Sequence, residues 1–95
     1  MARVTVRMVG VAKEAAGTPE ETLTIPPNSN VSTILQTLIE KYGDTFRDAI
    51  LDPSTQTPVS TIILLNGVET GNLQGLDTPV ADGDTIVLLS VTHGG

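Results

Sequence analysis

The sequence predicts an α+β domain in which a mixed sheet of four to five strands packs on one main helix. Three patterns support this class: alternating apolar and polar residues near the N-terminus, one long segment with a helical apolar period, and two late segments that are apolar on both faces. The 95 residues suit one domain, and 39% of them are hydrophobic, which is enough for a core. No repeat or linker divides the chain, so we expect a single domain.

Alternation predicts two strands in the first quarter of the chain. Between residues 3 and 8 every second side chain is apolar, which directs these apolar side chains to one face. Residues 22–25 alternate in the same way and stop at two prolines. We expect the two strands to pair as a hairpin. Residues 9–21 are interpreted as the loop between them, because two glycines and a proline interrupt the pattern.

The main helix is predicted over residues 31–42. Its apolar residues fall at i, i+3, i+4, i+7 and i+8, the spacing of one helix face, and are Val31, Ile34, Leu35, Leu38 and Ile39. Asn30 is a suitable N-cap and Gly43 a suitable residue just after the last turn. A shorter helical turn over residues 44–51 would stack Phe46 on Ile50.

Two further strands are predicted over residues 60–65 and 85–91. Both contain runs that are apolar on both faces, and such strands usually lie in sheets covered on both sides. The chain offers only one long helix, which is enough to cover one face. We therefore expect the opposite face to stay partly exposed and to serve as a partner surface. Asn66-Gly67 predicts a tight turn after the first of these strands.

Composition excludes several classes of function. Lys and Arg number only 5 against 11 Asp and Glu, and aromatic residues make up 2%, so a phosphate-binding surface and a base-stacking platform are both missing. No apolar run reaches the roughly 18 residues of a membrane span, and the N-terminus lacks the apolar core of a signal peptide. We expect no nucleic acid and no membrane as partners, and a cytoplasmic location.

Residues able to catalyse a reaction are scarce. With no cysteine and a single histidine, His93, the chain lacks disulfides, thiolate nucleophiles, iron–sulfur ligation and most zinc sites. Asp82-Gly83-Asp84 is interpreted as a turn, because a calcium loop needs more ligands. We expect a protein that is not an enzyme and that binds no metal or cofactor itself.

The pair Gly94-Gly95 gives the most direct indication of chemistry. Without Cβ atoms, two glycines adopt almost any backbone geometry and can thread a narrow channel in a partner's active site. Their free carboxylate can be converted with ATP into an acyl adenylate, which sulfide, a thiol or an amine can attack. The chain would then be a substrate and carrier for catalysis performed elsewhere. A frayed end is the alternative interpretation of the dipeptide alone.

The sequence resembles the β-grasp sulfur carriers and ubiquitin-like modifiers typified by MoaD, ThiS and the small archaeal modifier proteins. The resemblance runs in order along most of the chain. It comprises the opening strand with residues 11–17, the helix entry at Asn30-Val31, the turn Leu65-Asn66-Gly67, residues 73–78 with 81–84, and Gly94-Gly95. MoaD-like tails commonly read Pro-Pro-Val-x-Gly-Gly, whereas here Leu89 and Ser90 stand in place of the prolines.

This resemblance implies a β-grasp fold and a thiocarboxylate on Gly95 as the active species. It implies an adenylating partner of the MoeB, ThiF or UbaA type, related to the enzyme that activates ubiquitin. That partner would use ATP, magnesium and zinc, none of them bound by this chain. The sulfur acceptor would be the large subunit of molybdopterin synthase or an equivalent enzyme, with tRNA, thiamin and cysteine as other destinations.

The resemblance also assigns surfaces. Residues 1–91 would form the domain and residues 92–95 a flexible tail, whose Thr92, His93 and Gly94 thread into the partner's active site. By comparison with ubiquitin, Ile63, Leu65, Ile86 and Leu88 would face the core. The partner-binding surface would comprise the alternate residues Ile62, Leu64, Val87 and Leu89, together with Val91.

Two other functions remain open. The chain could be a ubiquitin-like modifier whose Gly95 forms an isopeptide bond with lysines of target proteins, or a non-covalent interaction domain whose tail is idle. Charge adds one expectation, because residues 48–95 contain six acids and no Lys or Arg: Asp48, Asp52, Glu69, Asp77, Asp82 and Asp84. We expect the Gly-Gly end to be attracted to a basic partner surface.

Overall fold

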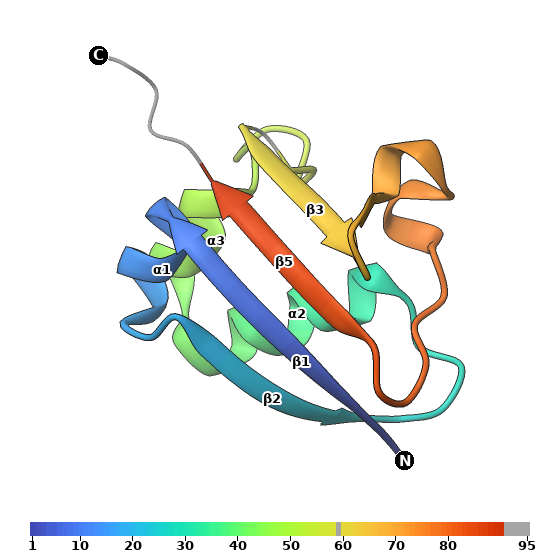
Figure 1. Cartoon of the computed structure of the whole chain (residues 1–95). Helices are drawn as coiled ribbons and strands as arrows, with labels where there is room; N and C mark the ends of the chain where they lie inside the picture. The colour runs from blue at the N-terminus through green and yellow to red at the C-terminus, as the bar shows by residue number, and fades with distance from the viewer. Residues whose placement is uncertain (59, 91–95) are drawn as a thin grey trace.

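A computed structural model describes residues 1–58 and 60–90 (Figure 1). Its five strands form one mixed sheet in the order β2-β1-β5-β3-β4, and the helices gather on one side of it (Figure 1). This arrangement confirms the predicted class. The strands are β1 Ala2–Gly10, β2 Glu20–Ile25, β3 Thr61–Leu65, β4 Val68–Glu69 and β5 Thr85–Ser90, and the α-helices are α1 Val11–Ala16, α2 Val31–Tyr42 and α3 Asp44–Ile50. Two short 3₁₀ turns, η1 Thr70–Asn72 and η2 Gly75–Asp77, follow β4.

The centre of the sheet is the parallel pair β1 and β5. The predicted hairpin is confirmed, because β2 pairs antiparallel to β1 from Ala2 opposite Ile25 to Arg7 opposite Glu20. On the other side, β3 pairs antiparallel to β5, and β4 adds two residues at the edge. The strand that leads to residues 91–95 therefore lies between two neighbours.

The main helix has the predicted bounds, and its caps explain them. The Asn30 side-chain oxygen accepts a hydrogen bond from the Thr33 backbone N–H at 3.0 Å, while the Thr33 hydroxyl accepts one from the Asn30 N–H at 3.4 Å. Such a reciprocal pair satisfies two donors of the first turn. The helix stops at Gly43, whose φ of 88° interrupts the helix before α3 begins.

One prediction was wrong, since residues 9–21 are not a loop. The strand β1 continues to Gly10, the six-residue helix α1 follows directly, and β2 begins at Glu20. Helix α1 has only six residues and buries only Ala12, so its sequence shows no apolar period from which a helix could be predicted. Gly17 ends it in the left-handed conformation, and its N–H donates to the Lys13 carbonyl at 2.9 Å.

The core lies between the helices and the inner face of the sheet. Alternate residues of the central strands are buried there, as predicted: Val4, Val6, Met8, Ile63, Leu65, Ile86 and Leu88. They pack in one cluster with the apolar side of α2 and with Phe46 and Ile50 of α3. In the described ranges, none of the helices has both the length and the apolar character needed to cross a membrane.

Candidate functional site

The predicted tail cannot be compared with the structure. Thr92, His93, Gly94 and Gly95, together with the surface residue Val91, lie outside the described residues. The part of the candidate site that the structure describes is the base of the tail and the open face of the sheet beside it.

The base of the tail is Ser90, the last residue of β5, and it is only 1% exposed. It pairs with Gly10 of β1 on one side and with Thr61 of β3 on the other. Its hydroxyl oxygen lies 3.3 Å from the Ala49 carbonyl oxygen and 3.3 Å from the Thr61 hydroxyl. Two strands and the last turn of α3 therefore fix the point from which the chain continues.

Gly10 allows this close approach. A Cβ atom on Gly10 would lie 2.0 Å from the Ser90 carbonyl oxygen, which is far inside van der Waals contact. Its φ of 75° and ψ of −134° also lie in a region that other residues rarely adopt. Glycine at position 10 is therefore required both by its own backbone conformation and by the end of β5.

The open face carries one apolar patch, formed by Val9, Ile62, Leu64, Val87 and Leu89. The strand register places Leu89 between Val9 and Ile62, and places Val87 between Arg7 and Leu64. Val9 is 46% exposed and Ile62 is 43% exposed, while the other three are half-buried. The outward direction predicted for four of these residues is confirmed, and the patch begins beside Ser90.

Val9 was missed by the sequence reasoning. The alternation that buries Val4, Val6 and Met8 continues by one step and directs Val9 outward together with Arg3, Thr5 and Arg7. The signal was present, but ending the strand at residue 8 concealed it.

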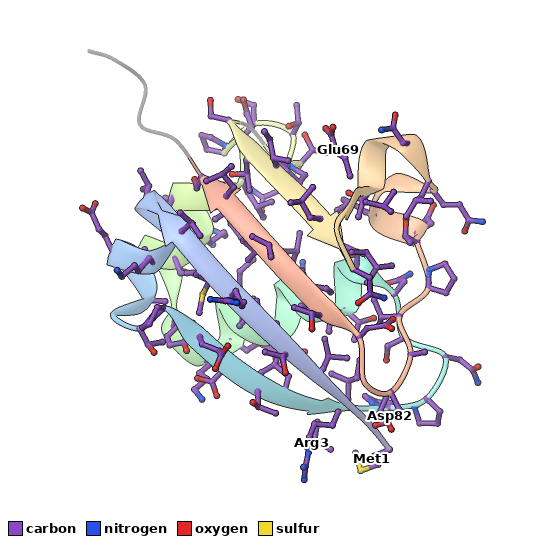
Figure 2. All side chains as sticks on the ribbon, in the orientation of Figure 1. Met1, Arg3, Glu69 and Asp82 are labelled. Carbon is purple, nitrogen blue, oxygen red and sulfur yellow. The ribbon has the colours of Figure 1, made fainter. Side chains whose placement is uncertain are left out.

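The acids at the N-terminal end of β5 hold turns together. Asp82 and Asp84 lie at the start of β5, at the other end of the strand from the tail, and Figure 2 shows Asp82 there beside Arg3. Asp82 accepts a hydrogen bond from the Arg3 backbone N–H at 2.8 Å. Asp84 accepts one from the Asn66 side-chain amide at 3.0 Å and one from the Ala81 N–H at 2.8 Å. These two acids stabilise turns, as predicted for residues 82–84, and precede β5 at the opposite end from Ser90.

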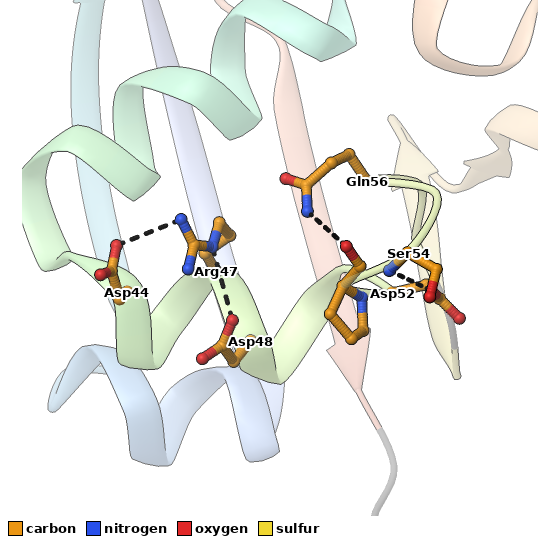
Figure 3. A network of polar contacts seen from close by, with 7 residues as sticks. Asp44, Arg47, Asp48, Asp52, Ser54 and Gln56 are labelled. Atoms are coloured by element: carbon orange, nitrogen blue, oxygen red, sulfur yellow. Dashed lines mark hydrogen bonds and ion pairs between the residues drawn. The ribbon is translucent and has the colours of Figure 1, made fainter.

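Three acids in and just after α3 are also engaged (Figure 3). Arg47 lies between Asp44, at 3.3 Å, and Asp48, at 3.4 Å, on the same helix. The Asp52 carboxylate accepts a hydrogen bond from the Ser54 N–H at 2.7 Å, which closes a turn. The acids of the second half of the sequence are therefore distributed over several parts of the described structure, and the attraction of the Gly-Gly end to a basic partner stays a prediction.

The strongest polar cluster lies away from the site and joins β2 to α2. Glu21 accepts hydrogen bonds from the Lys41 amine and the Tyr42 hydroxyl, both at 2.7 Å. These bonds, with that from Lys41 the larger cause, hold the pKa of Glu21 below its ordinary value. Burial and the bond to Glu21 raise the pKa of Tyr42 to about 12. The cluster joins β2 to α2 and stabilises the fold.

The described residues form an exposed apolar face and bring no cluster of metal-ligating side chains together. Within residues 1–58 and 60–90, no three His, Cys, Asp or Glu side chains come together as metal ligands would. What these residues provide is an apolar face next to a fixed strand end, an arrangement suited to presenting a tail to another protein. Fold and face together define a β-grasp protein of the ubiquitin-like class.

Comparison with known proteins identifies the family. The sequence matches the ThiS family over residues 6–95, and the chain belongs to that family of small ubiquitin-like carrier proteins. It is 36% identical over 70 residues to Ubiquitin-related modifier 1 of Encephalitozoon cuniculi, a match covering 70% of this chain and 72% of the relative.

Solved structures of similar proteins share the fold of this chain. Small archaeal modifier protein 1 of Methanosarcina acetivorans is similar with a TM-score of 0.77 and 32% identity, covering 100% of this chain and 98% of the other. Urm1 of Trypanosoma brucei is similar with a TM-score of 0.79 and 26% identity, covering 98% and 95%. The predicted β-grasp fold and the resemblance to sulfur carriers and ubiquitin-like modifiers are thereby confirmed.

Proposed function

We propose that this protein carries sulfur as a thiocarboxylate on Gly95 for a biosynthetic reaction. The observation that carries the proposal is the apolar patch, which begins directly beside the strand end that leads to the Gly94-Gly95 pair. The family match, which extends through residue 95, supports the same assignment. A partner that covers the patch would hold the tail within reach of its own active site.

The chemistry requires two steps in that partner. The Gly95 carboxylate attacks the α-phosphorus of ATP, which forms an acyl adenylate and releases pyrophosphate. Hydrosulfide then attacks the carbonyl carbon, and AMP leaves with the former carboxylate oxygen. This chain supplies the carboxylate and the docking surface. ATP and magnesium belong to the activating enzyme, which is of the type that activates ubiquitin, and the use of ATP supports a cytoplasmic location.

The acceptor of the sulfur belongs to a second partner. A molybdopterin-type synthase subunit is our first choice, because the helix entry, the Asn66-Gly67 turn and the diglycine resemble MoaD-like chains. That acceptor would bind the same apolar patch after the activating enzyme has left, so the two partners compete for one surface.

A second function is favoured by the names of the relatives. Ubiquitin-related modifier 1 and small archaeal modifier protein 1 are both called modifiers, and the first shares 36% identity with this chain. An amine that attacks the Gly95 adenylate or thioester in place of sulfide would give an isopeptide bond to a lysine of a target protein. Branched peptides in which Gly95 of this chain is joined to a lysine of a host protein would reveal this reaction.

ATP–pyrophosphate exchange by the activating enzyme of the native host tests the proposal. Exchange is expected with the full chain and should be lost when Gly94 and Gly95 are deleted, because the shortened chain ends in a His93 carboxylate that lies two residues nearer the domain and carries a bulky side chain. Tail deletion should leave thermal unfolding unchanged, since both residues lie beyond the buried Ser90. Exchange that persists after the deletion would contradict activation at Gly95. Absence of exchange with the full chain would support a non-covalent interaction domain.

A further inference from the structure

The strand register places the cation Arg7 beside the apolar patch on the β1 side. In the strand register, Arg7 of β1 is directly opposite Val87 of β5, which in turn lies opposite Leu64 of β3. The Arg7 side chain is 65% exposed. Glu69 of β4 lies opposite Leu64, so it flanks the same row at the sheet edge marked in Figure 2. The patch is therefore bounded by a positive group on one side and a negative group on the other.

Among residues 1–58 and 60–90, Arg7 has one ionic neighbour, and that contact is weak. Its Nε lies 3.9 Å from a carboxylate oxygen of Glu20, whose side chain is 57% exposed. Exposed ion pairs of this kind contribute about 0 to 1 kcal/mol, because water competes for both partners. The Arg7 guanidinium can therefore leave Glu20 and pair with another carboxylate at little cost in free energy.

Arg3 provides a comparison on the same strand and the same face. It lies four residues before Arg7, or about 13 Å at the rise of a strand. Its side chain is exposed and points away from the sheet at the opposite end of β1 (Figure 2). The hydroxyl-bearing residues Thr5 and Thr85 face each other in the register between Arg3 and the patch. Arg3 thus shares the charge of Arg7 but does not border the apolar residues.

We infer that Arg7 selects the docking partner: the activating enzyme presents an apolar surface that carries a carboxylate opposite Arg7. A partner that covers Val87 and Leu89 also removes water from the neighbouring guanidinium. An unpaired charge in that position is strongly unfavourable, whereas a carboxylate opposite it is favourable and also rejects partners that lack one. Glu69, with the opposite sign across the patch, would make the reversed orientation of docking repulsive. This inference rests on the proposed function.

Matched charge reversals separate this local role from general electrostatics. Arg7→Glu and Arg3→Glu lower the net charge of −6 by the same two units, so they change long-range attraction to a similar degree. For Arg7→Glu we expect an increase of about tenfold or more in the dissociation constant for the activating enzyme, measured by titration calorimetry. For Arg3→Glu we expect less than about threefold. Glu20→Gln removes the competing carboxylate and should tighten binding.

Three results would decide the matter. The inference would be overturned if Arg7→Glu and Arg3→Glu weakened binding to the activating enzyme equally, or if Arg7→Glu did not weaken it. Weaker binding of Glu20→Gln than of the wild-type chain would also overturn it. Arg7→Gln provides the same test without a new charge, should the reversal fail to fold in a thermal melt. If the wild-type chain itself neither binds nor undergoes ATP–pyrophosphate exchange, the proposed function fails, a result distinct from failure of the role of Arg7.

Discussion

Replacing Gly10 with alanine should disrupt the base of the tail more than any other single methyl group added at a described glycine. The new Cβ would lie 2.0 Å from the Ser90 carbonyl oxygen and 3.2 Å from its carbon, whereas Cβ contacts in proteins are essentially never shorter than 3.0 Å. The end of β5 must therefore move by about 1 Å or more relative to β1. The residue would also occupy a φ of 75° that alanine rarely adopts.

Two terms give the expected size of this effect. Alanine in this backbone conformation costs about 1 to 3 kcal/mol of stability, and a methyl group inserted where there is no space costs about 1 to 3 kcal/mol more. A loss of about 4 kcal/mol in the free energy of unfolding corresponds to a drop of about 20 °C in the melting temperature of a domain of this size. Thermal unfolding followed by circular dichroism measures it directly.

Gly17→Ala is the control for a methyl group added at positive φ without a clash. Gly17 has the same φ of 75°, but its ψ of 11° lies in the left-handed region, which alanine tolerates better than the ψ of −134° at Gly10. No atom outside its own neighbours lies within 4 Å of its hypothetical Cβ. Its substitution should lower the unfolding free energy by about 1 kcal/mol, the usual preference against a left-handed alanine. If the two variants melted at the same temperature, the contact with Ser90 would have no energetic importance and the reasoning would be refuted.

Three further predictions follow from the polar cluster, the turn and the patch. The lowered pKa of Glu21, caused first by the bond from Lys41, contributes stability above its ordinary value of 4.5 that is lost as pH falls below it. Glu21→Gln should therefore flatten the acid limb of a plot of unfolding free energy against pH, and an unchanged limb would contradict this. Asn66→Ala removes two side-chain hydrogen bonds and a residue suited to its φ of 50°, so urea denaturation should show a loss of about 2 kcal/mol. A loss below about 0.5 kcal/mol would show that the turn does not depend on it. Leu89→Asp places a charge on a half-buried residue of the patch, so it should raise the KM of the activating enzyme for this chain at least tenfold. An unchanged KM would show that the activating enzyme does not bind the patch.

Much of the fold could be predicted because its signals are local. The capping residue Asn30 and the terminating Gly43 bracket an apolar period long enough to read, so α2 has the predicted bounds. The inward and outward directions predicted for the side chains of β3 and β5 also agree with the structure, because side chains alternate strictly along a strand once one of them is placed.

The remaining features depend on contacts between distant segments. Helix α1 is held by its position between β1 and β2, and its six residues carry no period of their own. The turn residues Asn66 and Asp84 are 18 positions apart in sequence, yet their side chains hydrogen-bond to each other. The burial of Ser90 likewise depends on α3 and β3, which no pattern within β5 reveals.

The central claim, sulfur carried on Gly95, is tested most directly by intact mass spectrometry of the protein purified from its native host, before and after a thiol-specific alkylating agent. Exchange of oxygen for sulfur adds nearly the same mass as oxidation of Met1 or Met8, so mass alone is ambiguous. Alkylation removes the ambiguity, because the chain has no cysteine and a thiocarboxylate is the only thiol-like nucleophile expected. We predict an adduct that maps to Gly95. Tail peptides that show only a free carboxylate, with no adduct anywhere, would contradict sulfur carriage.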